Sequence, residues 1–412
     1  MLAAVLLTPY PAGADLGVLL RTRARRCPSV ARVTALPHDD LGTRWRAARP
    51  RPAVVHLNSA ACSRQSEQVL EAVARHARHE AEVGAHVAEA AAEGLLQQGR
   101  SVLAGLVGMA AADVAFTESA SASLRTLIGR WRLAPGTRVG VLPGEYWHNA
   151  AVLVDAGLVP VVLPADDLGR ADLAGVERVL RDDPPALVHV TLVASHRGVV
   201  QPGRELAALC RAAGVPLVLD VAQALGQVDC DLGADVAYAP ARKWLAGPRG
   251  VGFLVMRPSI TARLTPVVGP ELFDDGGAGV DHARWYESAD AHVAGRVGLV
   301  VALGEHLAAG PDRVRDRLAA LGRATRERLD GRGGWSVVEP LDSPTAITTL
   351  RPPAGVDVAA TVARLHAEHG VLVTAVGRER ARAELTGPVL RVSPHLDATL
   401  DDLDALAAGL AR

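Results

Sequence analysis

Lys243 lies in the stretch YAPARKWLAGPRGVGFLVM, residues 238–256, of a chain that otherwise uses arginine almost exclusively for positive charge. An arginine stays protonated at any relevant pH and cannot serve as an amine nucleophile, whereas a lysine can lose its proton and condense with a carbonyl. Lys243 is therefore a candidate nucleophile toward an aldehyde, and other side chains must supply the rest of such a site.

Further polar groups follow short apolar runs. Asp220 ends the run VPLVLD, where a carboxylate is costly unless it pairs with a cation such as a protonated pyridinium nitrogen. The segment Ser119–Ser123 follows DVAF and starts a helix, so its amides, hydroxyls and helix dipole suit a phosphate. Tyr146 or Trp147 is suited to stack on an aromatic ring. An aldehyde, a pyridinium and a phosphate on one molecule indicate pyridoxal 5′-phosphate as the cofactor.

The elements that must position these residues form an α/β pattern. The runs RVGVLP, LVHVTLV and PLVLDV are short, apolar and separated by helical patterns, which is typical of buried parallel strands. In such a sheet ligands bind outside the carboxyl ends of the strands, where these polar residues lie. We predict a large domain with a mostly parallel sheet and a smaller C-terminal α+β domain.

The predicted domain boundaries are residues 1–50 for an N-terminal extension, 51–300 for the cofactor-binding domain and 301–412 for the small domain. The first part of the cofactor-binding domain is expected to contribute to the small domain. Residues 63–108 are predicted as a long Ala-rich helical region, and residues 296–331 as one long helix. The initial MLAAVLLTPYPAG lacks a basic n-region and is predicted to be a strand, not a signal.

Composition excludes several classes of protein. The 412 residues carry a formal net charge of −1 without long single-sign runs, so neither nucleic acid nor a membrane is expected as a partner. His76 and His79 have i, i+3 spacing but no third convergent ligand, so no metal is expected. Scattered cysteines without CxxC spacing favour a cytoplasmic protein; they are Cys27, Cys62, Cys210 and Cys230.

The order of these residues resembles the class V aminotransferase family of fold type I. The stretch LDVAQALGQVDCDLGADVAYAPARKWLAGPRGVG contains a strand, Asp220, Gln223, a second strand, Lys243 and a glycine loop. The family places an Asp-x-x-Gln/His motif shortly before its cofactor lysine. The resemblance covers most of the chain from about residue 54 to the end.

The resemblance implies a role for each of these positions. Lys243 holds the cofactor, Asp220 pairs with its ring nitrogen, and Gln223 contacts its phenolic oxygen. The other implied cofactor residues are Ala120, Ser121 and Arg242 at the phosphate, Tyr146 stacked on the ring, and Ser195 near the phenolic oxygen. Pro240 and Ala241 replace phosphate-binding hydroxyls of the family, and Ala289 and Asp290 replace a Gly-Thr pair that reaches the neighbouring subunit. The resemblance also implies a homodimer with a shared active site, across whose interface lies YESADAHVAG.

The family includes transaminases, desulfurases, kynureninases, epimerases and lyases. A desulfurase keeps a cysteine in its C-terminal domain, and no cysteine follows Cys230 here, so persulfide chemistry is not expected. HLNSAACSRQS, LPGEYWHNAAVL and DDPPALVHVTLVASHRGVVQP are similar to C–S lyases of the ergothioneine pathway. This likeness implies β-elimination from a cysteine S-conjugate or its sulfoxide, giving pyruvate, ammonia and a sulfur product. The substrates implied by this likeness are hercynylcysteine sulfoxide and, as the alternative, a lincosamide-type thiol conjugate.

Substrate contacts are also implied by the resemblance. Arg391 in LRVSPH is expected to grip the substrate carboxylate. Further candidates around the leaving group are His56, Tyr146, Trp147, Arg64 and Arg249. Decarboxylative deamination and transamination remain open as outcomes, as does a catalytically silent relative that acts as a scaffold or ligand sensor.

Overall fold

The computed structural model describes residues 33–267 and 282–411. The strand predicted at the start of the chain lies outside these residues. The helices are α1 (Asp39–Ala47), α2 (Glu67–Val83), α3 (Ala85–Val107), α4 (Ala120–Arg130), α5 (Trp147–Asp155), α6 (Leu173–Asp182), α7 (Gly203–Ala212), α8 (Pro258–Thr261), α9 (Val293–Ala309), α10 (Pro311–Leu329), α11 (Val358–His369) and α12 (Leu400–Leu410). The strands are β1 (Val55–His56), β2 (Val114–Thr117), β3 (Arg138–Val141), β4 (Val159–Val162), β5 (Leu187–Thr191), β6 (Leu217–Asp220), β7 (Val236–Pro240), β8 (Gly252–Met256), β9 (Ser336–Val337), β10 (Thr348–Arg351), β11 (Val371–Leu372), β12 (Thr374–Val376) and β13 (Val389–Val392).

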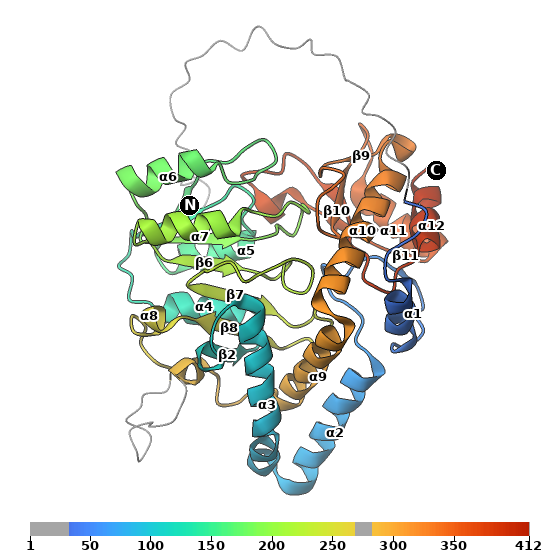
Figure 1. Cartoon of the computed structure of the whole chain (residues 1–412). Coiled ribbons are helices and arrows are strands. Elements are labelled where there is room, and N and C mark those ends of the chain that lie inside the picture. The colour runs from blue at the N-terminus through green and yellow to red at the C-terminus, as the bar shows by residue number, and fades with distance from the viewer. Residues whose placement is uncertain (1–32, 268–281, 412) are drawn as a thin grey trace. The chain divides into compact units, whose positions relative to one another are not determined.

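A seven-stranded sheet forms the centre of the large domain, in the order β2-β8-β7-β6-β5-β3-β4 (Figure 1). Strand β8 runs antiparallel to β2 and β7, and the other neighbouring strands pair in parallel. The predicted α/β fold with a mostly parallel sheet is therefore confirmed.

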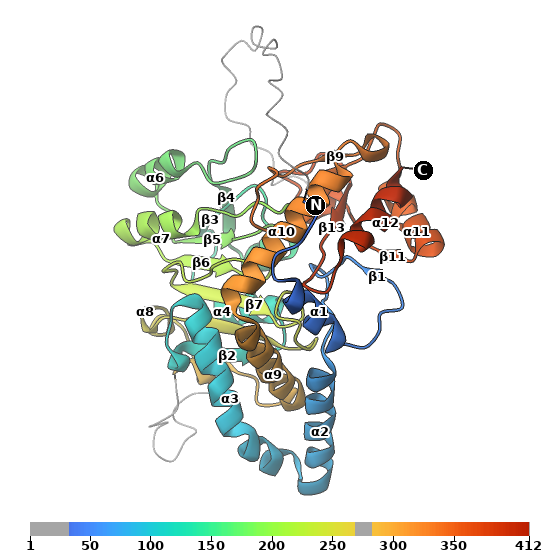
Figure 2. The ribbon, with the colours of Figure 1, turned by 45° about the vertical axis from the view of Figure 1, so that its right-hand side comes forward.

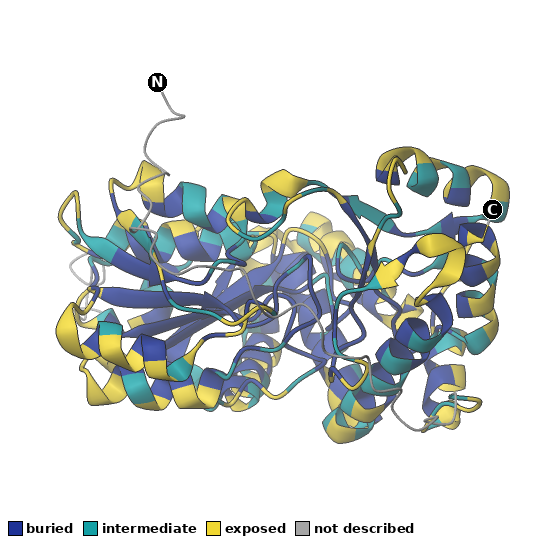
Figure 3. Cartoon of the chain, turned by 90° about the horizontal axis from the view of Figure 1, so that it is seen from above, coloured by how far each residue is buried: buried dark blue, intermediate teal, exposed yellow. Residues whose placement is uncertain are grey.

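Helices cover both faces of this sheet, and successive side chains of a strand enter different cores. Leu217 and Leu219 of β6 belong to the core that includes residues of α6 and α7. Val218 between them belongs to the core that includes residues of α4 and α5. Figure 3 shows the strands buried and the outer helix faces exposed. The short apolar runs of the sequence are explained by this burial on both faces.

The predicted helical region 63–108 and the predicted long helix 296–331 are each divided by a glycine. Gly84 has φ of 91° and separates α2 from α3. Gly310 has φ of 81° and precedes Pro311, where α9 and α10 meet at 84°. A left-handed backbone ends a helix and is tolerated by glycine. Helices α2, α3 and α9 pack side by side (Figure 2). Within the described ranges no single helix is long and apolar enough to cross a membrane, and only the bent α9–α10 pair passes that test jointly.

The small domain contains an antiparallel sheet of order β12-β13-β10-β9 and a parallel pair of β1 with β11. The stretch GVLVTAV supplies both β11 and β12, because its first half pairs with β1 and its second half pairs with β13. Helix α1 falls inside the predicted N-terminal extension, yet Leu41 and Trp45 are buried in the core. Arg317 of α10 donates hydrogen bonds to the carbonyls of Pro37 and His38, which tie this segment to the small domain.

Candidate active site

Four loops converge at one edge of the large sheet. Asp220 is the last residue of β6, and Lys243 follows β7, the strand paired with β6. Tyr146 follows β3, and Ser195 follows β5. Because the carboxyl ends of neighbouring parallel strands share one edge of a sheet, residues far apart in sequence come together there.

Asp220 is a buried carboxylate that takes part in none of the ion pairs among the described residues. Asn149 Nδ2 donates a hydrogen bond to its Oδ2 at 2.9 Å, and the N–H of Ala222 donates to its Oδ1 at 2.8 Å. Burial raises the pKa of Asp220, and the charge of Lys243 opposes that shift. A protonated ring nitrogen is the kind of partner that such a carboxylate lacks.

Lys243 is suited to act as a neutral amine. Burial lowers its pKa to about 7, Asp220 opposes that shift, and neighbouring cations add to it. These cations are Arg242, Arg391 and Arg380. An amine that titrates near neutral pH is available both as a nucleophile and as a general base.

Two side chains are available for a phenolic oxygen. Gln223 Oε1 accepts from Trp244 Nε1 at 3.0 Å, and its Nε2 donates to the carbonyl of Ala60 at 2.8 Å, which leaves one amide N–H. The Oγ of Ser195 is buried without a hydrogen-bond partner in the described part of the chain. Buried hydroxyl and amide groups normally find partners, so both fit an oxygen acceptor supplied by a cofactor.

The N-terminus of α4 forms a cup suited to a phosphate. Ser119 caps this helix, since its Oγ accepts from the N–H of Ala122 at 3.1 Å. Ala120 and Ser121 begin the first turn, whose N–H groups have no intrahelical acceptors and favour an anion. A Cβ on Gly252 of β8 would lie 2.8 Å from the carbonyl carbon of Ser119, so the glycine lets this loop pack closely.

Arg242 precedes Lys243 and is half-buried. Burial lowers the pKa of this guanidinium. Pro240 ends β7 and Ala241 is buried, and neither side chain offers a hydroxyl. A phosphate bound at this edge therefore depends on the α4 cup and on Arg242.

Tyr146 lies immediately before α5. Its backbone N–H donates to Glu145 Oε1 at 2.8 Å, and the guanidinium of Arg380 lies over its ring at 5.3 Å from the centroid. Trp147 stands edge-on to Tyr146, with 5.9 Å between the ring centroids, and is 45% exposed. The Tyr146 ring thus lies between the large domain and a segment of the small domain, whereas Trp147 borders solvent.

Arg391 of β13 is a buried guanidinium with no carboxylate partner among the described residues. Its Nη1 donates to the carbonyl of Ser195 at 2.9 Å, and its Nη2 donates to Asn58 Oδ1 at 3.1 Å. The Nε has no partner. Burial and the charges of Arg380 and Arg242 lower the pKa of Arg391 to about 9. An anion at this position would offset the cost of burying the charge.

The other substrate residues predicted from the sequence are His56, Arg64 and Arg249, and the charge of Arg249 acts on Arg242. His56 and Arg64 line a pocket of about 530 Å³ that also contains Asp397. Arg64 forms an ion pair with Asp397, so its charge is already compensated. Arg249 is exposed in the loop before β8. The charge of Arg391 acts on Lys243, whereas the guanidinium of Arg64 is paired with Asp397.

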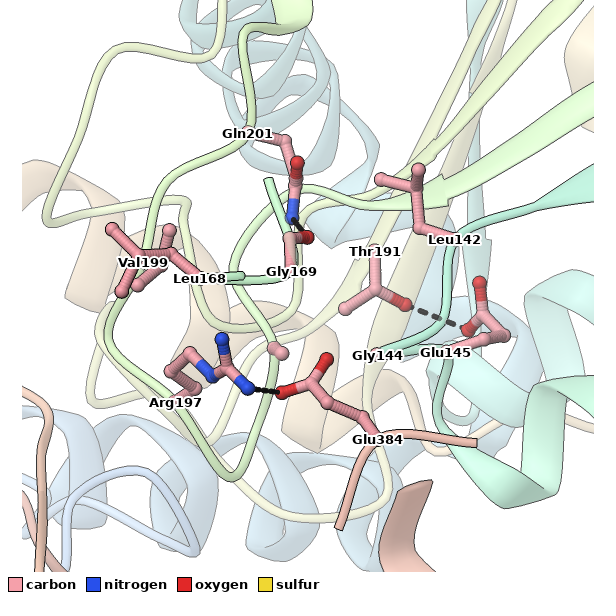
Figure 4. Close-up of a pocket in the computed structure, with 11 residues that line it drawn as sticks. Leu142, Gly144, Glu145, Leu168, Gly169, Thr191, Arg197, Val199, Gln201 and Glu384 are labelled. Atoms are coloured by element: carbon pink, nitrogen blue, oxygen red, sulfur yellow. Dashed lines mark hydrogen bonds and ion pairs between the residues drawn. The ribbon is translucent and has the colours of Figure 1, made fainter. Parts of the chain in front are cut away.

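A buried polar network was not predicted from the sequence. Glu145 Oε1 accepts from Asn149 Nδ2 at 2.9 Å and from Thr191 Oγ1 at 2.7 Å, the second of which appears in Figure 4. Glu145 Oε2 lies 2.9 Å from His189 Nδ1. Burial opposes ionisation of Glu145, but the charge of His189 and the hydrogen bonds from His189, Thr191 and Asn149 together lower the pKa of Glu145. Since Asn149 also bonds Asp220, this ion pair holds the Asp220 carboxylate in place.

Glu384 links the small domain to the edge of the large sheet. It follows the short 3₁₀ helix η5 (Arg378–Ala381) and pairs with Arg197, as Figure 4 shows, and with His196 at 2.8 Å. Its Oε2 would lie 2.6 Å from a Cβ on Gly144, so only a glycine admits it there without displacement. The segment that carries η5 is thereby held against the loops of the large domain.

Together these groups fit pyridoxal phosphate. Lys243 offers an amine for the aldehyde and Asp220 a carboxylate for the ring nitrogen. Donors without a protein acceptor among the described residues are available for the phenolic oxygen, and the N-terminus of α4 is available for the phosphate. The fold and the site define a fold type I enzyme that depends on this cofactor. A model of the aminotransferase class-V family matches residues 55–406, and the chain belongs to that family.

Curated relatives agree with this assignment. A probable hercynylcysteine sulfoxide lyase of Mycobacterium tuberculosis is 50% identical over 375 residues, which span 90% of this chain and 93% of the relative. An isopenicillin N epimerase of Amycolatopsis lactamdurans is 29% identical over 406 residues, spanning 90% and 98%.

Solved structures share the fold. The apo cysteine desulfurase of Thermococcus onnurineus NA1 gives a TM-score of 0.77 at 21% identity, covering 92% of this chain and 98% of that one. The cystine C-S lyase C-DES, in complex with its product cysteine persulfide, gives 0.78 at 18% identity, covering 87% and 97%. With the family match and the relative named as a sulfoxide lyase, the chain is a pyridoxal phosphate-dependent lyase.

Proposed function

We propose that this chain is a C–S lyase that cleaves a cysteine S-conjugate or its sulfoxide by β-elimination. The observation that carries the proposal is Arg391, a buried guanidinium that has no carboxylate partner among the described residues. It lies near Lys243, and the pKa of this lysine is about 7. Such a pair suits an amino-acid substrate, since one group binds a carboxylate and the other removes a proton. The relative named as a probable hercynylcysteine sulfoxide lyase supports a sulfoxide substrate of that type.

When bound, pyridoxal phosphate supplies an electron sink at the α-carbon of an amino acid. Arg391 orients the substrate by its carboxylate, and the amine of Lys243 takes the α-proton. Asp220, positioned by Asn149, favours a protonated ring nitrogen. The electron pair of the Cα–H bond forms a Cα=Cβ bond as the Cβ–S bond breaks, and the sulfur departs with its electrons. Water then converts the three-carbon enamine into pyruvate and ammonia.

The remaining cofactor contacts belong to the same proposal. Gln223 and Ser195 would donate to the phenolic oxygen, and Tyr146 would stack on the ring. The amides of Ala120 and Ser121 would bind the phosphate together with Arg242. The hydroxyl of Ser195 lacks a partner within the described part of the protein, and the N–H groups of Ala120 and Ser121 lack acceptors within α4, which supports this arrangement.

We expect the protein to release pyruvate and ammonia from hercynylcysteine sulfoxide without carbon dioxide. The measurement offers this sulfoxide beside a bulkier cysteine-conjugated sugar and a simple alkyl cysteine, and assays pyruvate and carbon dioxide separately. Carbon dioxide with an aldehyde and no pyruvate would instead indicate decarboxylative deamination. A keto acid that retains sulfur would indicate transamination, and preference for the sugar conjugate would favour the lincosamide-type substrate.

We also propose a homodimer. Helices α2 and α3 expose apolar side chains that a second copy would cover: Leu70, Val83, Val87 and Leu95. Ser288–Asp290, within the predicted interface segment, is exposed as well. Light scattering should therefore give twice the chain mass of 43.0 kDa. A monomer mass with full activity at high dilution would refute the dimer.

The cytoplasm is the proposed site of action. Cys62, Cys210 and Cys230 are free thiols, and burial raises the pKa of Cys210 to about 12. Unpaired, unreactive thiols are compatible with a reducing compartment.

A further inference from the structure

Arg380 is a cation at the site that the proposed chemistry does not use. It lies on η5 of the small domain, and its guanidinium stands 5.3 Å from the centroid of the Tyr146 ring. Its charge lowers the pKa of both Lys243 and Arg391. Arg380 therefore lies near the groups that receive the substrate.

The two carboxylates nearest to Arg380 in the sequence, Glu379 and Glu384, do not pair with it. Glu379 folds back onto its own turn, where a Cβ on Gly377 would lie 2.3 Å from its Oε1. Glu384 pairs with Arg197 and His196. None of the ion pairs or side-chain hydrogen bonds among the described residues involves Arg380, and Tyr146 is its one aromatic contact there. Arg380 is half-buried, and a guanidinium that lies near other cations without a counter-charge favours an anionic ligand.

The anionic groups of the proposed chemistry already have partners. The cofactor phosphate is assigned to the α4 cup and Arg242, and the substrate α-carboxylate to Arg391. Asp220 is assigned to the protonated ring nitrogen of the cofactor. One guanidinium remains, and its planar fork matches a further carboxylate.

We propose that Arg380 binds a second carboxylate, carried by the sulfur substituent of the substrate. The substrate class is then a cysteine S-conjugate or sulfoxide that bears an acid on the leaving group. Arg391 and Arg380 hold the two ends of such a molecule, with the scissile Cβ–S bond between them and the Tyr146 ring beside it. This inference rests on the proposed C–S lyase function.

The test compares S-carboxyethyl-cysteine sulfoxide with S-carbamoylethyl-cysteine sulfoxide, which match in size and differ in charge. We expect the wild type to prefer the acid by roughly 10- to 100-fold in kcat/KM, the effect of a charge-assisted hydrogen bond. In Arg380→Gln the ratio of the two substrates should fall to near unity. Because the ratio is measured within one protein, losses of folding or of cofactor cancel.

A control and a second readout complete the experiment. Arg378 lies on the same turn, is exposed, and donates from Nε to the carbonyl of Leu385 at 3.2 Å. Arg378→Gln should keep the wild-type preference. Calorimetric binding of both sulfoxides to Lys243→Ala, with and without Arg380→Gln, measures the same preference without turnover.

The outcomes separate the two proposals. Pyruvate from both sulfoxides, with no acid preference or with a preference that survives Arg380→Gln, overturns the role of Arg380 and leaves the lyase function standing. Failure to form pyruvate from any sulfoxide overturns the lyase function. The dissociation constants of the acid and the amide then still decide whether Arg380 binds a carboxylate.

Discussion

Lys243→Ala should carry no borohydride-stable cofactor adduct on the protein and turn over at less than about 10⁻³ of the wild-type rate. The loss is large because one side chain both attaches the cofactor and moves the α-proton, and proton transfer alone contributes about 10²–10⁴-fold. Lys243 is the only lysine in the sequence of 412 residues. After borohydride reduction, peptide mapping of the yellow wild type should therefore place the adduct on this side chain.

Lys243→Arg is the matched control for charge. It keeps a cation beside Asp220 but supplies a guanidinium that does not condense with an aldehyde. Both variants should lose the adduct and activity, whereas thermal unfolding should show that each remains folded. A borohydride-stable adduct or near-normal turnover in Lys243→Ala would refute the assignment of the cofactor lysine.

Part of the site could be predicted because adjacent parallel strands bring their carboxyl ends together. Asp220 ends β6 and Lys243 follows β7, and these two strands pair directly, so sequence order alone placed both residues at one edge. Arg391 required the family resemblance, since its strand belongs to the antiparallel sheet of the small domain. The apolar runs identified the buried strands because both faces of the large sheet are covered.

Other parts of the site depend on contacts that a linear pattern does not record. The bond from Asn149 to Asp220 spans 71 positions, and it exists because α5 begins at the edge where β6 ends. Arg380 reaches Tyr146 only because the small-domain segment carrying η5 packs against the large domain. Arg64 has the charge expected of a substrate ligand, but it forms an ion pair with Asp397 in the pocket that both residues line. A charged residue can bind a substrate only if no side chain of opposite charge pairs with it in the folded protein. Such pairs cannot be derived from the order of residues in the sequence.

Arg391→Met should lower kcat/KM for cysteine sulfoxides by roughly two to three orders of magnitude, because a bidentate carboxylate clamp is worth about 3–4 kcal/mol. The free energy of unfolding should change by only about 1–2 kcal/mol, since the removal of an uncompensated buried charge offsets the hydrogen bonds lost at Ser195 and Asn58. Steady-state kinetics and denaturant titration of the same preparation measure both quantities.

Arg326 of α10 is a control with the opposite expected result. It is about as buried as Arg391, but in the described residues its guanidinium donates hydrogen bonds to backbone carbonyls. Its guanidinium donates to the carbonyls of Leu341, Ser343, Thr345 and Ile347. Arg326→Met should leave several buried acceptors unpaired, so it should destabilise the fold by about 3 kcal/mol or more while the folded fraction keeps nearly normal kcat/KM. If Arg391→Met instead behaved like Arg326→Met, losing stability while its folded fraction kept normal kcat/KM, Arg391 would be a structural arginine and another group would have to bind the substrate carboxylate.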